Sequence, residues 1–350
     1  MKHGYTISGQ TVGRDVVVDM MKMILSVLVV FLHAEVKIGF LYPFLHAAVP
    51  LLFMTSGYYF FRKVGRAENP VQRRAVLGKF LKRNMILYAV WFVALLPITL
   101  YIRDWFSGSF LNGLRQLVLS FLFNSTFRGS WYIMALNIGV MLVYWASLKL
   151  KTQTLLAITL PVYLICCLFS NYYGLVEDNA VVVDLYEEYL SVFQSLTNSY
   201  PAGLLWIVLG KYFSERDVDM KKAGSPCFIA VFAVVLVLEY LLITVFELGY
   251  AGQAYLSLIP FCVAVFCCVM TAKITIGSDY RFGNASTIIY VTHASILTVM
   301  RSVFRRMLPL TGELQKWAII LVTMIVCLVI CWVVFTLERK KGFRWMRYAY

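Results

Sequence analysis

The sequence predicts an all-α membrane protein, a bundle of about ten transmembrane helices with both termini in the cytoplasm. Of the 350 residues, 61% are hydrophobic, whereas a soluble domain is usually about 45–50% apolar. The mean hydropathy is +0.75, and several uninterrupted apolar runs reach about 20 residues, the length that spans a bilayer. The alternating pattern of membrane barrel strands is absent.

The apolar runs, taken in order, give the expected spans. They cover residues 20–41, 44–61, 84–102, 130–148, 154–171, 200–213, 226–246, 253–272, 284–304 and 317–337. A further apolar segment, Leu117 to Phe123, is too short to span alone, and we expect it to be interfacial or re-entrant. No internal repeat is visible and no loop is long enough for a second domain, so we expect one membrane domain over 1–350.

The distribution of Lys and Arg predicts the orientation. With the N-terminus inside, the inner loops hold 23 of the 32 basic residues, and the outer segments hold 8. Cytoplasmic loops are enriched in Lys and Arg, so this bias favours an even number of spans with both termini cytoplasmic. The net charge of +14 follows from these loops. No aromatic–basic surface module accompanies it, and we expect no nucleic-acid partner.

Nearly all of the eight cysteines lie inside apolar runs, where a thiol acts as a small hydrophobic group. Cys327 and Cys331 share a helical face, but no His or carboxylate joins them. We therefore expect no metal site.

The first expected span carries the candidate site. The segment from Asp19 to His33 is an apolar run that contains one lysine, Lys22, and ends on a histidine. Lys22 and His33 are eleven residues apart, almost three helical turns, so they share a face and lie roughly 16 Å apart along the axis. An ionisable group at membrane depth is costly, which makes His33 a candidate functional group. The alternative is a packed histidine bonded to a neighbouring carbonyl.

Polar residues flank this pair. Arg14 and Asp19 lie at the expected cytoplasmic edge, and Asp19 can pair with Lys22 at i,i+3. Ser26 lies seven residues before His33 on the same face. We expect a polar strip that leads from the cytoplasm to an imidazole acting as general base. The alternative is an interfacial anchor, with Lys22 reaching to the lipid headgroups.

Other candidates come from later segments. Glu35 lies near the outer end of the first span and points to another face. Ser56 belongs to a group of small residues in the second span, which lines a cavity or serves helix packing. Trp131 opens the fourth span, where an aromatic belt is the alternative. Tyr290 and His293 are i,i+3 in the ninth span.

The loop expected at 62–83 is strongly basic. Within it, Lys79, Lys82 and Arg83 share a helical face at the entrance to the third span. A row of cations at the cytoplasmic mouth suits a phosphate-bearing donor. Membrane topology and attraction to anionic lipid are the alternative reasons for this charge.

Together these pieces resemble acyltransferase family 3 of integral membrane proteins. That family opens with an Arg and an Asp, then has an Arg or Lys, ten residues and a His, which are Arg14, Asp19, Lys22 and His33 here. The family's later motifs are matched by VPLLFMTSGYYF in the second span, KFLKR before the third, SWYIMAL at the fourth and IYVTHASI late in the chain.

The resemblance implies a multi-pass O-acyltransferase of the plasma membrane. It would move an acyl group, commonly acetyl, from cytoplasmic acyl-CoA to a hydroxyl of a surface glycan or a lipid-linked sugar. His33 would be the general base or acyl relay, and Arg14, Lys22 and the basic row would hold the donor's phosphates. Lysine at position 22 keeps the charge of the commoner arginine but loses its fork geometry. Some relatives carry a soluble esterase-like domain, and we expect none here.

A second class of function stays open. Similar membrane domains occur fused to the vancomycin-resistance serine racemases, where a transport role has been proposed. The alternative is therefore a transporter for a small, serine-like amino acid or a glycan intermediate. Transporters often show inverted repeats, and because none is visible here we favour the enzyme.

Overall fold

The structure is a computed structural model that describes residues 16–36, 38–103, 108–216, 218–249, 254–274, 280–307 and 312–350. All regular secondary structure in these ranges is helical, as expected. The α-helices are α1 (Val16–Ala34), α2 (Tyr42–Leu45), α3 (Ala48–Gly65), α4 (Pro70–Ile102), α5 (Phe110–Phe123), α6 (Trp131–Ala146), α7 (Thr152–Leu168), α8 (Ala180–Phe193), α9 (Tyr200–Glu215), α10 (Met220–Ala223), α11 (Pro226–Val245), α12 (Leu258–Thr271), α13 (Phe282–Met307) and α14 (Gly312–Leu337). Short 3-10 helices are η1 (Gly39–Leu41), η2 (Tyr173–Leu175) and η3 (Lys341–Ala349).

Six helical stretches within the described ranges are long and apolar enough to cross a membrane. They are Val16–Ala34, Gly39–Gly65, Pro70–Ile102, Pro226–Val245, Phe282–Met307 and Gly312–Leu337. The other expected spans fall on α6, α7, α9 and α12, which have 14 to 17 residues. The chain is therefore a multi-pass membrane protein by helix length and composition, while the count of about ten spans and the orientation of the termini stay predictions.

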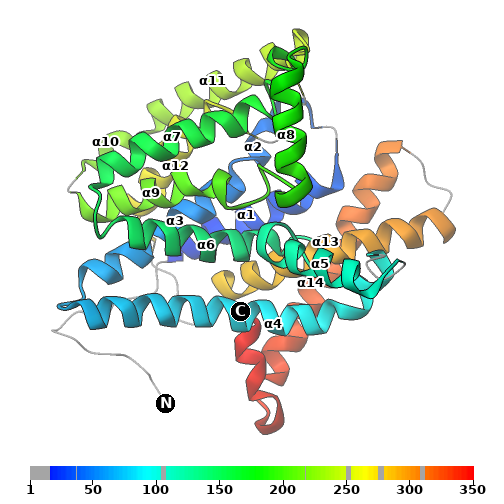
Figure 1. Ribbon diagram of the computed structural model, residues 1–350. Helices are drawn as coiled ribbons and strands as arrows, with labels where there is room; N and C mark the ends of the chain where they lie inside the picture. Colours follow the sequence, from blue (N-terminus) through cyan, green and yellow to red (C-terminus); the bar gives the residue numbers. More distant parts are fainter. Residues whose placement is uncertain are drawn as a thin grey trace.

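The basic segment expected as a loop over 62–83 is mostly helical, so that expectation is wrong. The helix α3 continues to Gly65, and α4 begins at Pro70 after a short turn. The side chain of Asn69 accepts a hydrogen bond from the backbone N–H of Gln72 at 2.9 Å, which caps α4. Proline at the first helical position needs no N–H partner, so the Asn–Pro pair starts the helix there. As a result α4 runs along one side of the bundle, well beyond the expected span (Figure 1).

The helices α3 and α9 pack at very short range. A Cβ atom at Gly57 of α3 would lie only 2.7 Å from the carbonyl oxygen of Ile207 in α9. Gly210 of α9 lies against the backbone of α3 in the same way. Small residues permit such close approach of helices in a membrane, so this pair fixes the spacing of the walls that α3 and α9 give to the pocket described below.

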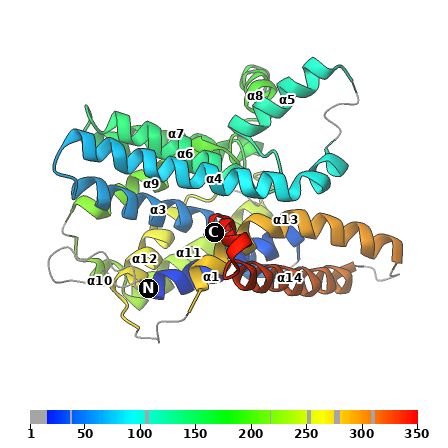
Figure 2. The ribbon, with the colours of Figure 1, turned by 90° about the horizontal axis from the view of Figure 1, so that it is seen from below.

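The helix α1 packs on α13 and runs parallel to it. Near the start of both, the Ser286 hydroxyl donates to the Lys22 carbonyl oxygen at 2.9 Å. Near the end of α1, the His33 ring lies 5.2 Å from the ring of His293. Figure 2 shows this layer, with α14 beside α13 and with α5 and α8 set off together from the body of the bundle.

The C-terminal segment is held against α4 and the start of α13. The Trp91 indole donates to the Ala349 carbonyl oxygen at 2.8 Å. Arg281 pairs with Glu338 at 2.6 Å, and the Tyr350 hydroxyl donates to the same carboxylate. Burial alone raises the pKa of Glu338, but the hydrogen bonds from Tyr350 and Arg281 and the charge of Arg281 bring it below its usual value. This ion pair therefore closes the last segment onto the bundle.

Candidate functional site

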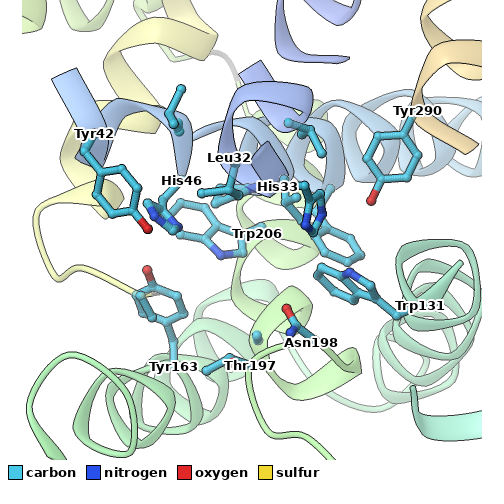
Figure 3. A pocket seen from close by; sticks show the side chains of 17 residues that line it. Leu32, His33, Tyr42, His46, Trp131, Tyr163, Thr197, Asn198, Trp206 and Tyr290 are labelled. Carbon is cyan, nitrogen blue, oxygen red and sulfur yellow. The ribbon is translucent and has the colours of Figure 1, made fainter. Parts of the chain in front are cut away.

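A cavity of about 320 Å³ opens at the C-terminal end of α1 and is called the His33 pocket here. Its walls come from α1, α2, α3, α6, α7, α9 and α13, from residues 197–198 and from residue 254 (Figure 3). Aromatic rings dominate, and none of the 17 residues that line it is Asp, Glu, Lys or Arg. A concave site that combines apolar and aromatic side chains with polar groups is a common form of a small-molecule site.

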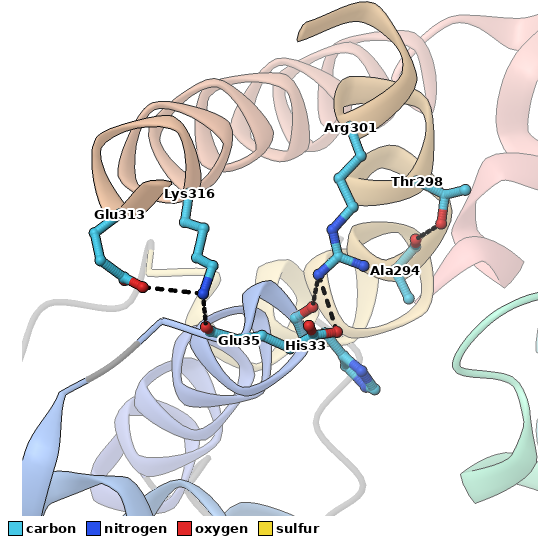
Figure 4. Close-up of polar contacts among 7 residues, drawn as sticks. All are labelled: His33, Glu35, Ala294, Thr298, Arg301, Glu313 and Lys316. Atoms are coloured by element: carbon cyan, nitrogen blue, oxygen red, sulfur yellow. Dashed lines mark hydrogen bonds and ion pairs between the residues drawn. The ribbon is translucent and has the colours of Figure 1, made fainter. Parts of the chain in front are cut away.

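His33 lies in the last turn of α1, and its exposed side chain lines this pocket. Two cations fix the helix end that carries it (Figure 4). Arg301 of α13 donates to the His33 carbonyl oxygen at 2.7 Å, and Lys316 of α14 donates to the Glu35 carbonyl oxygen at 2.7 Å. Cations at a helix C-terminus interact favourably with its unpaired carbonyls and dipole. The histidine therefore stands on an anchored helix end.

Glu35, a supporting candidate, has a structural part in this anchor. It adopts a left-handed backbone with φ of 58°, a conformation that costs roughly 1–2 kcal/mol for a residue other than glycine. Its carboxylate pairs with Arg301 at 3.3 Å, while Lys316 also pairs with Glu313 at 3.0 Å. These contacts hold the turn that ends α1. Glu35 does not line the His33 pocket.

His293 lies behind His33. It is 0% exposed and does not line the pocket. Its Nδ1 lies 3.1 Å from the Ile289 carbonyl oxygen, which can only accept, so we assign the proton to Nδ1. Its Nε2 is then left with a lone pair and has no hydrogen-bond partner among the described residues. The planes of the two imidazoles are tilted by 34° to each other, and only His33 reaches the cavity.

Three other candidates lie at the wall next to His293. Trp131 and Tyr290 both line the pocket. Ser56 does not, but its hydroxyl lies 3.3 Å from the hydroxyl of Tyr132, whose ring packs edge-on against Tyr290 at 5.2 Å. Ser56 thus supports the wall through a neighbour.

The expected polar strip between Lys22 and His33 is packed with protein. Ser26, Val29 and Val30 lie between them on α1 and are 0%, 1% and 0% exposed. The Ser26 hydroxyl turns back to the Met23 carbonyl oxygen at 2.8 Å and does not line the pocket.

The remaining candidates lie away from the pocket. Asp19 is buried against Gly283 at the start of α13, where the helix dipole favours a carboxylate, and it pairs with Lys22 at 3.8 Å. The basic row on the first half of α4 is exposed; it consists of Lys79, Lys82 and Arg83. None of these residues lines the pocket. Arg14 falls outside the described residues.

Two residues with notable surroundings were not among the candidates from the sequence. His46 follows α2 and lines the pocket. Glu239 of α11 accepts the backbone N–H groups of Leu256 and Ser257, both at 2.7 Å, and the hydroxyl of Tyr172 at 2.6 Å. The pKa of Tyr172 is raised, mainly by burial and secondly by this hydrogen bond. A lone carboxylate inside an apolar run was the available signal for Glu239.

Comparison with known proteins decides the family. A family model described as an acyltransferase domain matches residues 15–336, nearly the whole chain. The chain belongs to this acyltransferase family. The resemblance expected from the motifs is therefore confirmed, and the acyltransferase domain is the part of the chain that holds the His33 pocket.

Two curated relatives are similar to part of this acyltransferase domain. An "Amino-acid racemase" of Enterococcus faecalis is 25% identical over 218 residues, 61% of this chain and 29% of that protein. A "Serine/alanine racemase" of Enterococcus gallinarum is 22% identical over 250 residues, 69% of this chain and 35% of that protein. The chain thus spans about a third of the length of these relatives. No solved structure matches.

Proposed function

We propose that the protein is an O-acyltransferase of the plasma membrane that moves an acyl group, commonly acetyl, from acyl-CoA to a hydroxyl of a surface glycan or lipid-linked sugar. The observation that carries the proposal is His33, which lines an open cavity from an anchored helix end in a chain of this family.

In this proposal the His33 imidazole is the general base. It takes the proton of the acceptor hydroxyl while the hydroxyl oxygen attacks the thioester carbonyl carbon. A carbon–oxygen bond forms, the carbon–sulfur bond breaks, and the leaving thiolate takes up the proton from the imidazolium. A histidine is suited to both transfers because its unperturbed pKa lies near neutral pH.

The lining of the pocket bears on the choice between enzyme and transporter. A free amino acid carries a carboxylate and an ammonium group, and burying either without an opposite charge is costly. None of the described residues that line the pocket carries a charge. An acyl group and a sugar hydroxyl are neutral, so this lining supports acyl transfer over transport of a serine-like substrate.

The donor's phosphates need cations, and these lie outside the pocket. We propose that Lys22, at the other end of α1, and the exposed row Lys79, Lys82 and Arg83 attract this end of the donor, with Arg14 as a further candidate. With the phosphates held near Lys22, the arm of the donor that carries the thioester would have to extend roughly 16 Å along α1 to reach His33.

The test is transfer of radiolabelled acetyl from acetyl-CoA to surface glycan in membranes that contain the wild type, His33→Ala or His33→Gln. Both variants are expected to lose transfer by at least about a hundredfold, the typical contribution of a general base. Ile24→Ala is the matched control, because Ile24 is on the same helix and 57% exposed. Transfer that is equal in the wild type and His33→Ala would rule the role out. Uptake of radiolabelled serine by proteoliposomes without acyl-CoA would favour the transporter.

A further inference from the structure

The His33 pocket contains a second histidine that the proposed chemistry does not use. His46 comes directly after α2, is 8% exposed and lines the pocket. Its ring lies 5.2 Å from the ring of Tyr42 and 5.6 Å from that of Tyr255. Its Nε2 makes no hydrogen bond with any described residue. Buried polar groups are normally paired, so an orphaned nitrogen beside a cavity needs an explanation.

Packing alone does not account for an imidazole at this position. The neighbours of His46 are aromatic rings, against which a phenylalanine would pack without leaving a polar atom unpaired. A neutral imidazole has one donor and one acceptor nitrogen, so His46 can meet a ligand hydroxyl in either role.

The surroundings indicate what kind of ligand reaches His46. Trp206 and Trp131 give the pocket broad aromatic faces, which carry partial negative charge and attract the C–H side of an uncharged ring. Asn198 adds an amide that can bind hydroxyls. Figure 3 shows His46 and His33 along one side of the cavity, with Asn198 across from them. Among the residues that the structure describes, the lining offers no charged side chain to pair with a phosphate or a carboxylate.

We propose that His46 is a second ligand-contacting histidine, which holds a hydroxyl of a neutral polyhydroxylated ring while another hydroxyl of the same ring is presented to His33. The inference rests on the proposed function and deepens it, because it assigns the His46 end of the pocket to the acceptor. His46 then sets which hydroxyl reaches the base, and it takes no proton itself.

The experiment measures binding without requiring transfer. Protein in lipid nanodiscs is titrated with neutral methyl glycosides (glucoside, galactoside, mannoside and N-acetylglucosaminide), with glucose 6-phosphate and with L-serine. Binding is followed by tryptophan fluorescence, because Trp131 and Trp206 line the pocket. We expect saturable binding of at least one neutral glycoside, weaker binding of the phosphate and none of serine. His46→Phe should weaken glycoside binding by about tenfold, and His46→Gln, which keeps hydrogen-bonding groups, should restore part of it.

Thr55→Val is the matched control. Thr55 is 1% exposed and its Oγ1 is also unpaired among the described residues, but it does not line the pocket. This variant removes a buried orphaned group and should bind the glycoside as the wild type does. Equal binding by His46→Phe and wild type, no response to any neutral glycoside, or tighter binding of the phosphate or serine would each overturn the inference.

The two proposals fail separately. If the wild type binds a glycoside through His46 but transfers no acetyl, the assignment of His46 stands and the proposed acyl transfer does not. If transfer depends on His33 while His46→Phe binds and transfers normally, the enzyme stands and the role of His46 does not.

Discussion

Replacing Arg301 by glutamine tests whether the anchored end of α1 matters for activity. Glutamine is shorter and uncharged, so it loses the 2.7 Å bond to the His33 carbonyl oxygen and the 3.3 Å ion pair with Glu35. A hydrogen bond from a charged donor contributes about 1.5–3 kcal/mol. The side chains of Arg301 and Glu35 are 32% and 74% exposed, and screening by solvent lowers the expected cost to about 1 kcal/mol. We expect the melting temperature to fall by only about 2 °C.

The effect on transfer should be much larger than the effect on stability. His33 is one residue from the end of α1, and freeing that end displaces the imidazole from its position in the pocket. Misplacing a catalytic group by about 1 Å costs up to a hundredfold, so we expect kcat to fall by at least about tenfold with little change in KM for acetyl-CoA. The control is Arg305→Gln, one turn further along α13 and exposed. Equal kcat in Arg301→Gln and wild type, or an equal loss in Arg305→Gln, would refute the reasoning.

Three further predictions concern the packing of the helices and of the C-terminal segment. Gly57→Ala places a methyl group 2.7 Å from the Ile207 carbonyl oxygen and should cost about 1–3 kcal/mol, seen as a lower melting temperature. In Gly65→Ala, on the same helix, the added methyl group has no neighbour within 4 Å, so the melting temperature should not fall. Glu239→Leu leaves the N–H groups of Leu256 and Ser257 unpaired and should destabilise by about 1–3 kcal/mol, more than Glu239→Gln, in the same assay. Because the folded-state pKa of Glu338 is lowered, its contribution is complete above the unfolded pKa of about 4.3 and is lost as pH falls through the folded value. The melting temperature of the wild type should therefore drop more steeply than that of Glu338→Gln below about pH 5.

Features that depend on a single helix could be predicted from the sequence. The apolar run of α1, its Lys22–His33 spacing and the family motifs needed no tertiary information, and the helical class and the family are confirmed. Periodicity gives the face of a residue but not where its helix stops, so His33 was placed within a span, although it lies one residue before the end of α1. Asn69 and Pro70 form a local signal for the start of α4, but a reading by hydropathy alone does not detect it because the following residues are basic.

Contacts between distant segments could not be predicted in the same way. Arg301 and His33 are 268 residues apart in the chain, and neither segment contains a sequence signal that identifies the other as its partner. His46 stands at the edge of an apolar run, where the sequence alone does not distinguish a histidine at the membrane surface from one in a pocket. Its burial depends on rings that α2 and residues near 255 bring together.

The face of α1 between Lys22 and His33 is packed against protein, and this limits how a ligand could pass from one end of the helix to the other. The His33 pocket reaches down to Val29, and the next residue on that face, Ser26, is sealed against its own helix and 0% exposed. Hydrogen bonds join α1 to α13 near both ends of α1: Ser286 bonds to the Lys22 carbonyl oxygen and Arg301 to the His33 carbonyl oxygen. The α3–α9 pair is equally closed, because Gly57 and Gly210 bring their backbones into contact. Under the proposed function, a donor arm that enters beside Lys22 would have to pass this packed face of α1 to reach the imidazole, and the proposed binding of the donor's phosphates would supply free energy for such an opening.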